Sequence, residues 1–170
     1  GPPALRRRLA RLMAMDRAQR RLRTRRVRNT RRARPVGMGV LPPVALARTY
    51  DAGTRQRLPG RLVRSAGDPP VADRPVNEAL DGSVLMLDFL KKAFQRVSLD
   101  GQGLPLLSSV HFGRKYVNAF WNGRQMVYGD GDGKVFAPFT RDLDVIGHEL
   151  SHGLVQYEAA LDYSGQSGAL

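Results

Sequence analysis

The chain has 170 residues, of which 42% are hydrophobic and none is cysteine. This length is sufficient for one domain with a hydrophobic core. The lack of cysteine excludes a disulfide framework and a thiolate metal site. No apolar run in the sequence reaches the ~18–20 residues that a membrane-spanning helix requires, so no membrane span is expected.

The formal net charge of +13 comes from one end of the chain. Residues 1–36 contain fourteen arginines and a single acid, Asp16, whereas the positive and negative charges of residues 37–170 balance. The basic surplus therefore describes an N-terminal arm, and it says nothing about the body of the protein.

Residues 1–47 are predicted to be an arginine-rich helix followed by a linker. The apolar residues Leu5, Leu9, Leu12 and Met13 recur at helical spacing. A stretch rich in glycine and proline then interrupts the pattern, as is typical of linkers. No signal peptide is visible, because the apolar core of such a peptide is missing.

The arm has two interpretations by composition. A basic helix can bind nucleic acid or an anionic membrane surface. This arm has no aromatic residue for base stacking and matches no DNA-binding motif, so the composition favours a solvated or partly disordered basic segment over a nucleic-acid partner.

Residues 48–142 are predicted to form a mixed α+β body. Residues 104–112, 116–121 and 125–128 are strand candidates, and the last two are separated by an Asn-Gly pair, a strong hairpin signal. Residues 75–97 favour a helix, because their apolar residues share one broad stripe. The stripe consists of Val76, Ala79, Leu80, Val84, Leu87, Leu90, Phe94 and Val97.

A five-residue motif carries the chemistry. His148-Glu149-Leu150-Ser151-His152 has the pattern H-E-x-x-H and lies where a helix is expected, with Thr140 or Asp142 as its N-cap. A spacing of four places both imidazoles on one helical face, where two ring nitrogens can reach one cation. Glu149 projects about 100° away, where it can accept a proton from a water bound to the metal.

The alternative is a helix with two surface histidines and an unrelated glutamate. Two observations favour zinc binding instead. Only three histidines occur in the chain, and two of them fall in this motif. Gly147 and Gly153 flank the motif, and small residues suit a helix that packs closely along the floor of a cleft.

Three segments carry a resemblance to a known family. Asp144–Gly153 resembles the zinc-binding helix of the thermolysin family of neutral metallopeptidases, and so do Asn118–Gly123 and Met126–Gly133. The similarity runs from about Thr49 to Leu170. The basic arm is similar to the short propeptide of protealysin-like enzymes, which covers the cleft of the enzyme until it is removed.

This resemblance implies an α+β fold, consisting of the thermolysin-like N-terminal β-rich subdomain and the central zinc-binding helix. Residues 143–170 would hold this helix and the start of the C-terminal part, with the C-terminal helical domain missing. The resemblance also implies a zinc-dependent metalloendopeptidase that acts on proteins or peptides, with Ca²⁺ besides Zn²⁺. Secretion is implied as well, with a cytoplasmic location as the alternative.

The resemblance assigns catalytic and substrate-binding roles. His148 and His152 would ligate zinc, and Glu149 would be the general base that activates water. Asn118 and the backbone carbonyl of Ala119 would bind the substrate backbone in the manner of an edge strand. Asn118 could instead serve the turn network beside the hairpin.

Four further residues receive roles from the resemblance. Phe136, Phe139 and Val145 would line the apolar pocket for the side chain that follows the cleaved bond. Ordinary core packing is the alternative for the two aromatic residues. Asp144 matches a calcium ligand of the family, and its alternative is an acid in the first turn favoured by the helix dipole.

Two other features are interpreted as structural. His111 is predicted to be a structural strand residue. The segment Asp130-Gly131-Asp132-Gly133 begins like a calcium-binding EF-hand loop, but Lys134 stands where that loop needs a carboxylate. The segment is therefore predicted to be a glycine-rich turn.

The resemblance places the third zinc ligand, a glutamate, about twenty residues after His152 and beyond Leu170. Two functions follow. The chain is expected to be the N-terminal piece of a zinc endopeptidase precursor, and the isolated 170-residue chain is expected to be inactive. The alternative is a catalytically inactive binding or regulatory protein with a basic N-terminal arm.

Overall fold

The computed structural model describes residues 46–133 and 138–159. Nearly all of the predicted arm and linker lies outside these residues, and the body begins with Ala47. The elements, in chain order, are β1 (Ala47–Asp51), β2 (Arg61–Ser65), α2 (Arg74–Phe94), β3 (Leu106–Val110), β4 (Ala119–Trp121), β5 (Met126–Tyr128), the 3₁₀ turn η2 (Phe139–Arg141) and α3 (Leu143–Glu158). The predicted mixture of a β-rich part followed by the H-E-x-x-H helix is confirmed.

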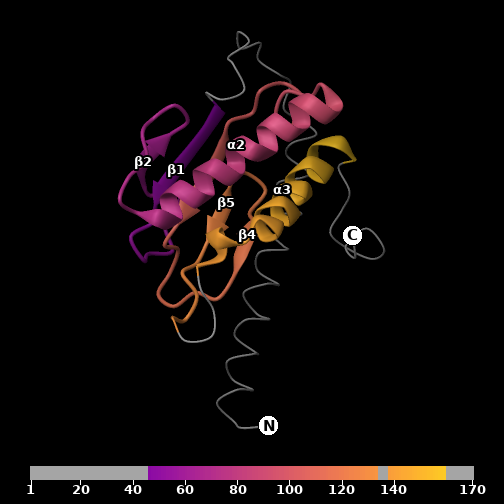
Figure 1. Ribbon diagram of the computed structural model, residues 1–170. Helices are drawn as coiled ribbons and strands as arrows, with labels where there is room; N and C mark the ends of the chain where they lie inside the picture. The colour runs from indigo at the N-terminus through magenta and orange to yellow at the C-terminus, as the bar shows by residue number, and fades with distance from the viewer. Residues whose placement is uncertain (1–45, 134–137, 160–170) are drawn as a thin grey trace, which may run out of the picture.

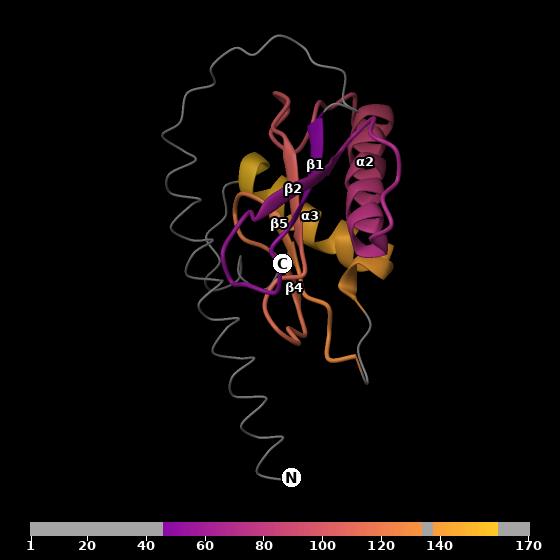
Figure 2. The ribbon, with the colours of Figure 1, turned by 90° about the vertical axis from the view of Figure 1, so that its left-hand side faces the viewer.

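The five strands form one mixed sheet in the order β2-β1-β3-β5-β4. The pairs β1–β2 and β4–β5 are antiparallel, whereas β1–β3 and β3–β5 are parallel. Parallel neighbours need a crossover connection, and α2 lies in the connection between β1 and β3. Figure 1 shows α2 and α3 side by side across the sheet, and Figure 2 shows α2 standing off one face of it.

Helix α2 follows the predicted apolar stripe, but it begins one residue earlier and ends three residues earlier than predicted. It ends at Phe94 because Gln95 adopts a left-handed conformation with φ 53°, and the Arg96 N–H then donates to the Leu90 carbonyl. Phe94 was predicted to face the core, and it is 64% exposed and contacts Phe89 edge-on. Among the described residues, no helix has the length and apolarity needed to cross a membrane.

The two faces of the sheet contribute to different apolar clusters. Successive side chains of a strand point to opposite faces, so neighbouring residues of β4 separate. Trp121 joins the main core, which lies between the sheet and the two helices and includes Leu80 and Leu150. Phe120 joins a smaller cluster on the other side, where its ring meets that of Phe112 edge-on.

Helix α3 is anchored at its start by contacts with α2. Asp142 occupies the N-cap position, but its side chain makes no capping hydrogen bond. Thr140, the other predicted cap, donates from Oγ1 to Oε2 of Glu78 on α2 at 2.7 Å. A Cβ atom on Gly82 of α2 would lie 2.6 Å from Cδ1 of Ile146. The two helices therefore approach closely where α2 has no side chain.

Candidate metal centre

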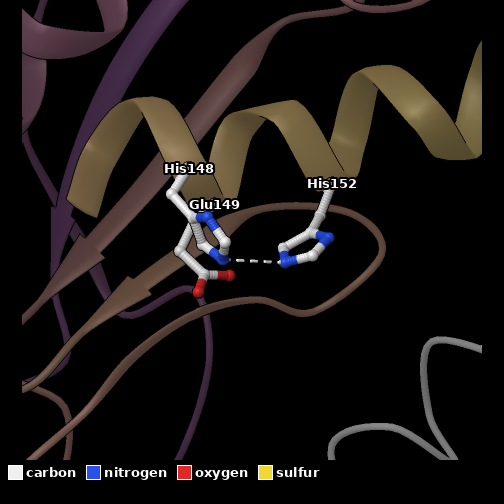
Figure 3. A group of neighbouring side chains, drawn as sticks. All are labelled: His148, Glu149 and His152. Carbon is white, nitrogen blue, oxygen red and sulfur yellow. Dashed lines mark hydrogen bonds between the residues drawn. The ribbon is translucent and has the colours of Figure 1, made fainter. Parts of the chain in front are cut away.

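His148 and His152 lie one turn apart on the same face of α3, and their rings converge (Figure 3). The two Nε2 atoms are 3.2 Å apart, and the ring planes are nearly perpendicular at 86°. The main chain imposes this arrangement, since residues four apart on a helix are neighbours. Both imidazoles therefore present a nitrogen to the same point beside the helix.

Glu149 completes a cluster with the two imidazoles. One ligand atom from each of the three side chains lies within 4.8 Å of the others. Its Oε2 atom accepts a hydrogen bond of 2.9 Å from the backbone N–H of Trp121 on β4. The carboxylate is therefore oriented by the sheet as well as by its own helix.

The two imidazoles fit a zinc ion. Zinc binds imidazole nitrogen, and a catalytic zinc has three protein ligands and an open position for water or substrate. His148 is exposed, whereas Glu149 and His152 are half-buried, so the cluster is open to solvent on one side. In residues 46–133 and 138–159, no other group of three histidine or acidic residues has such converging ligand atoms.

The edge strand β4 runs beside this cluster. Backbone groups alternate in direction along an antiparallel strand. The Trp121 N–H points away from β5 towards Glu149, so Ala119, two residues earlier, presents its backbone to the same outer edge. Asn118 lies just before β4, where its Oδ1 accepts from the Ala119 N–H at 2.9 Å. The structure therefore brings Ala119 to the edge that Glu149 contacts.

The other predicted site residues do not belong to the cluster of His148, Glu149 and His152. Phe139 on η2 and Val145 on α3 are half-buried and pack against the main core. Asp144 lies exposed in the first turn of α3. Phe136 lies outside the described residues.

Residues 29–156 match the family described as thermolysin metallopeptidase, catalytic domain. The chain belongs to this family. The resemblance drawn from the three sequence segments is confirmed, and the five-stranded sheet with its central helix is the thermolysin-like N-terminal subdomain.

Several relatives support the same assignment. The chain is 55% identical over 121 residues to an extracellular metalloprotease of Pectobacterium carotovorum subsp. carotovorum, covering 71% of this chain and 35% of that protein. It is 44% identical over 124 residues to thermolysin of Alicyclobacillus acidocaldarius subsp. acidocaldarius, covering 72% of this chain and 23% of that protein. Among solved structures, it resembles the precursor of protealysin, a metalloproteinase from Serratia proteamaculans, with a TM-score of 0.70 and 48% identity, covering 79% of this chain and 40% of that one. The chain thus spans well under half the length of these thermolysin-family proteins.

Sequence patterns did not reveal a buried contact that Gln156 makes one turn after His152. The indole N–H of Trp121 donates to Oε1 of Gln156 at 3.0 Å, and Nε2 of Gln156 donates to the Gly123 carbonyl at 3.1 Å. Gln156 follows His152 by one helical turn, yet it is only 2% exposed. The available signal was Gln156 itself, a polar residue at a buried position of the helix, because such a residue needs hydrogen-bond partners.

His111 was predicted to lie in a strand, and its position differs from that prediction. It follows the last residue of β3 and has a positive φ of 55°. Its Nδ1 lies 2.8 Å from Asp130 and its Nε2 lies 2.9 Å from Asp73, the N-cap residue of α2. The hydrogen bond to Asp130 has the largest effect and burial opposes it, while the contact with Asp73 adds to the rise, so the pKa of His111 increases to about 9.

The segment that begins with Asp130 is irregular, and its contacts run to the chain before β4. Besides the contact of Asp130 with His111, the Gly131 N–H donates to the Tyr116 carbonyl at 3.0 Å. Gly131 and Gly133 have positive φ values of 73° and 68°, and the glycine-rich turn stays a prediction.

Proposed function

We propose that the full-length protein carrying this segment is a zinc-dependent metalloendopeptidase. The observation that carries the proposal is the convergence of the two imidazole Nε2 atoms, 3.2 Å apart, beside a glutamate fixed by the edge strand. Membership of the thermolysin metallopeptidase family supports the same reaction. Zinc ligation by His148 and His152 is part of this proposal.

The residues of this chain divide the work of peptide hydrolysis. Zinc, when bound, supplies a Lewis acid that polarises the scissile carbonyl and increases the acidity of water. Glu149 takes a proton from the attacking water and passes it to the leaving amine. The Trp121 N–H keeps the accepting carboxylate in place, which reduces the reorganisation needed in the transition state.

The substrate is an extended peptide that lies along the outer edge of β4. The position of Ala119 supports this arrangement, because backbone groups at the edge of a sheet pair readily with an added strand. Asn118 binds the same peptide at the start of β4. Phe136, Phe139 and Val145 line the pocket for the residue after the cut, so the enzyme prefers a bulky apolar residue there.

Calcium binding, a propeptide and secretion complete the proposal. Asp144 contributes to a calcium site at the start of α3, where its carboxylate is exposed. The basic arm is a propeptide that covers the cleft, and similarity to the protealysin precursor supports this role. Secretion is supported by the relative named extracellular metalloprotease.

The proposal is tested with the full-length protein and an internally quenched peptide that has a bulky apolar residue after its central bond. Cleavage should disappear with a chelator and return with zinc. Replacing Glu149 by Gln should retain zinc and lower turnover by ~10²–10⁴-fold, since the residue moves a proton and does not hold the metal. Turnover that persists without metal would overturn the proposal, and tight zinc binding without any cleavage would favour an inactive binding or regulatory protein.

A further inference from the structure

We propose that Gln156 is a positioning residue for the general base Glu149, acting through Trp121. This inference rests on the proposed function, because it assigns Glu149 the role of base. Two hydrogen bonds, both made by Trp121, connect the residues. The Gln156 amide bonds the indole of Trp121, the indole belongs to strand β4, and the Trp121 backbone N–H bonds the Glu149 carboxylate.

Both the oxygen and the nitrogen of the Gln156 side-chain amide form a hydrogen bond. Its Oε1 accepts from the indole N–H at 3.0 Å, and its Nε2 donates to the Gly123 carbonyl at 3.1 Å. Gly123 lies in the turn between β4 and β5. A buried amide is costly unless its donor and acceptor are both bonded. The side chain therefore links α3 to β4 and to the turn that follows it.

Gly153 lets the indole lie directly against the backbone of α3. A Cβ atom at this position would be 3.1 Å from Cε2 of Trp121 and 2.8 Å from Cδ1 of Leu99. The Trp121 side chain is fully buried. It is therefore held at one side by helix backbone and at its N–H by Gln156, which restricts both its position and its rotation.

The two hydrogen bonds of Trp121 begin and end on the same helix, α3. Glu149 and Gln156 are seven residues apart, which is about two turns of α3. Between them, the chain of contacts leaves the helix, passes through one residue of the edge strand and returns. Strand β4 has only three residues, so its ladder alone fixes the Trp121 backbone weakly. Gln156 supplies the additional restraint that keeps the Trp121 N–H directed at Glu149.

The test compares two substitutions at one site with a control on the same helix. Gln156→Met retains the length of the side chain but removes both hydrogen bonds, and Gln156→Glu retains an oxygen for the indole N–H. Glu158→Gln is the control. It removes the ion pair with Arg96, and Glu158 takes no part in the hydrogen bonds that join Gln156, Trp121 and Glu149.

In the full-length protein, Gln156→Met should lower kcat by about 10- to 100-fold with KM and zinc content unchanged, since small displacements of catalytic groups have effects of this size. Gln156→Glu should recover part of this loss, and Glu158→Gln should have the kcat of the unchanged protein. A Gln156→Met protein with unchanged kcat, or with a loss confined to KM, would overturn the inference.

A second measurement on the 170-residue chain separates this inference from the proposed function. Trp121 is the only tryptophan, so its fluorescence reports on the indole directly. Gln156→Met should shift this emission to longer wavelength and accelerate hydrogen exchange of the Trp121 amide, whereas Glu158→Gln should do neither. An unchanged Trp121 amide would refute the positioning role even in an active enzyme. Absence of all peptidase activity would refute the proposed function while these two signals still report the contact.

Discussion

His111 should make the stability of this protein decrease as the pH rises above neutrality. Its two ring nitrogens lie 2.8 Å from Asp130 and 2.9 Å from Asp73, and only the protonated ring can donate to both carboxylates. The hydrogen bond to Asp130 is the main reason that the pKa rises from 6.5 to about 9. A raised pKa in the folded state stabilises fully below pH 6.5, and the contribution is lost as the pH rises through about 9.

The size of the effect follows from the shift and from the exposure of the partners. At 1.36 kcal/mol per pKa unit, a rise from 6.5 to about 9 has an upper bound of about 3 kcal/mol. The side chains of Asp73 and Asp130 are 36% and 35% exposed, so water screens the pair substantially. A contribution of roughly 1–2 kcal/mol remains after this screening.

The assay compares the unchanged chain with His111→Asn by urea unfolding at about pH 6 and about pH 10. Asparagine is the suitable replacement, because it tolerates the positive φ at this position without bridging the two carboxylates. Groups that titrate in both proteins cancel in the comparison. The unchanged chain should lose roughly 1–2 kcal/mol more than the variant over this interval. Equal losses in the two proteins would refute the assignment of a charged bridge.

Three further predictions concern the metal centre and the packing. Replacing His148 or His152 by Ala should each lower the zinc affinity of the chain at least about 10-fold by calorimetry, and unchanged affinity would contradict a shared ion. Gly129→Ala would place a Cβ atom 2.1 Å from the backbone oxygen of Tyr116, so the free energy of unfolding in urea should decrease by at least ~2 kcal/mol, and an unchanged value would refute this contact. Arg64→Leu removes the buried guanidinium that bonds β2 to α2, which should cost about 2–3 kcal/mol in the same assay, and a cost below ~0.5 kcal/mol would mean that these bonds contribute little.

The elements that the sequence predicted well are those whose signal is local. The spacing of His148 and His152 requires only that their segment be helical, and the same face then follows from helix geometry. The Asn122-Gly123 pair lies between β4 and β5, as a hairpin signal predicts. Both strands are short, and Tyr116, assigned to the first of them, lies before β4.

The contacts that the sequence did not reveal join residues far apart in the chain. Trp121 and Gln156 are 35 residues apart, and Asp73 and His111 are 38 residues apart. A periodic pattern shows which face of an element is apolar, but it does not show which polar residue of another element reaches that face. The parallel pairing of β1 with β3 could not be predicted for the same reason, because the pattern of each strand does not show which other strand it pairs with.

Helix α3 has to meet opposite demands on its two sides. His148 and His152 need an open side to bind the proposed metal ion, and an exposed helical face by itself does little to hold a helix still. The opposite side supplies rigidity, because Gly153 there admits the indole of Trp121 against the backbone and Ile146 fits against Gly82 of α2. Contacts made at backbone level fix the axis of the helix more firmly than contacts between long side chains, whose ends can change rotamer. A larger residue at Gly153 would therefore displace the two imidazoles together, and it would alter the position of the whole centre relative to β4 while leaving the spacing of its ligands intact.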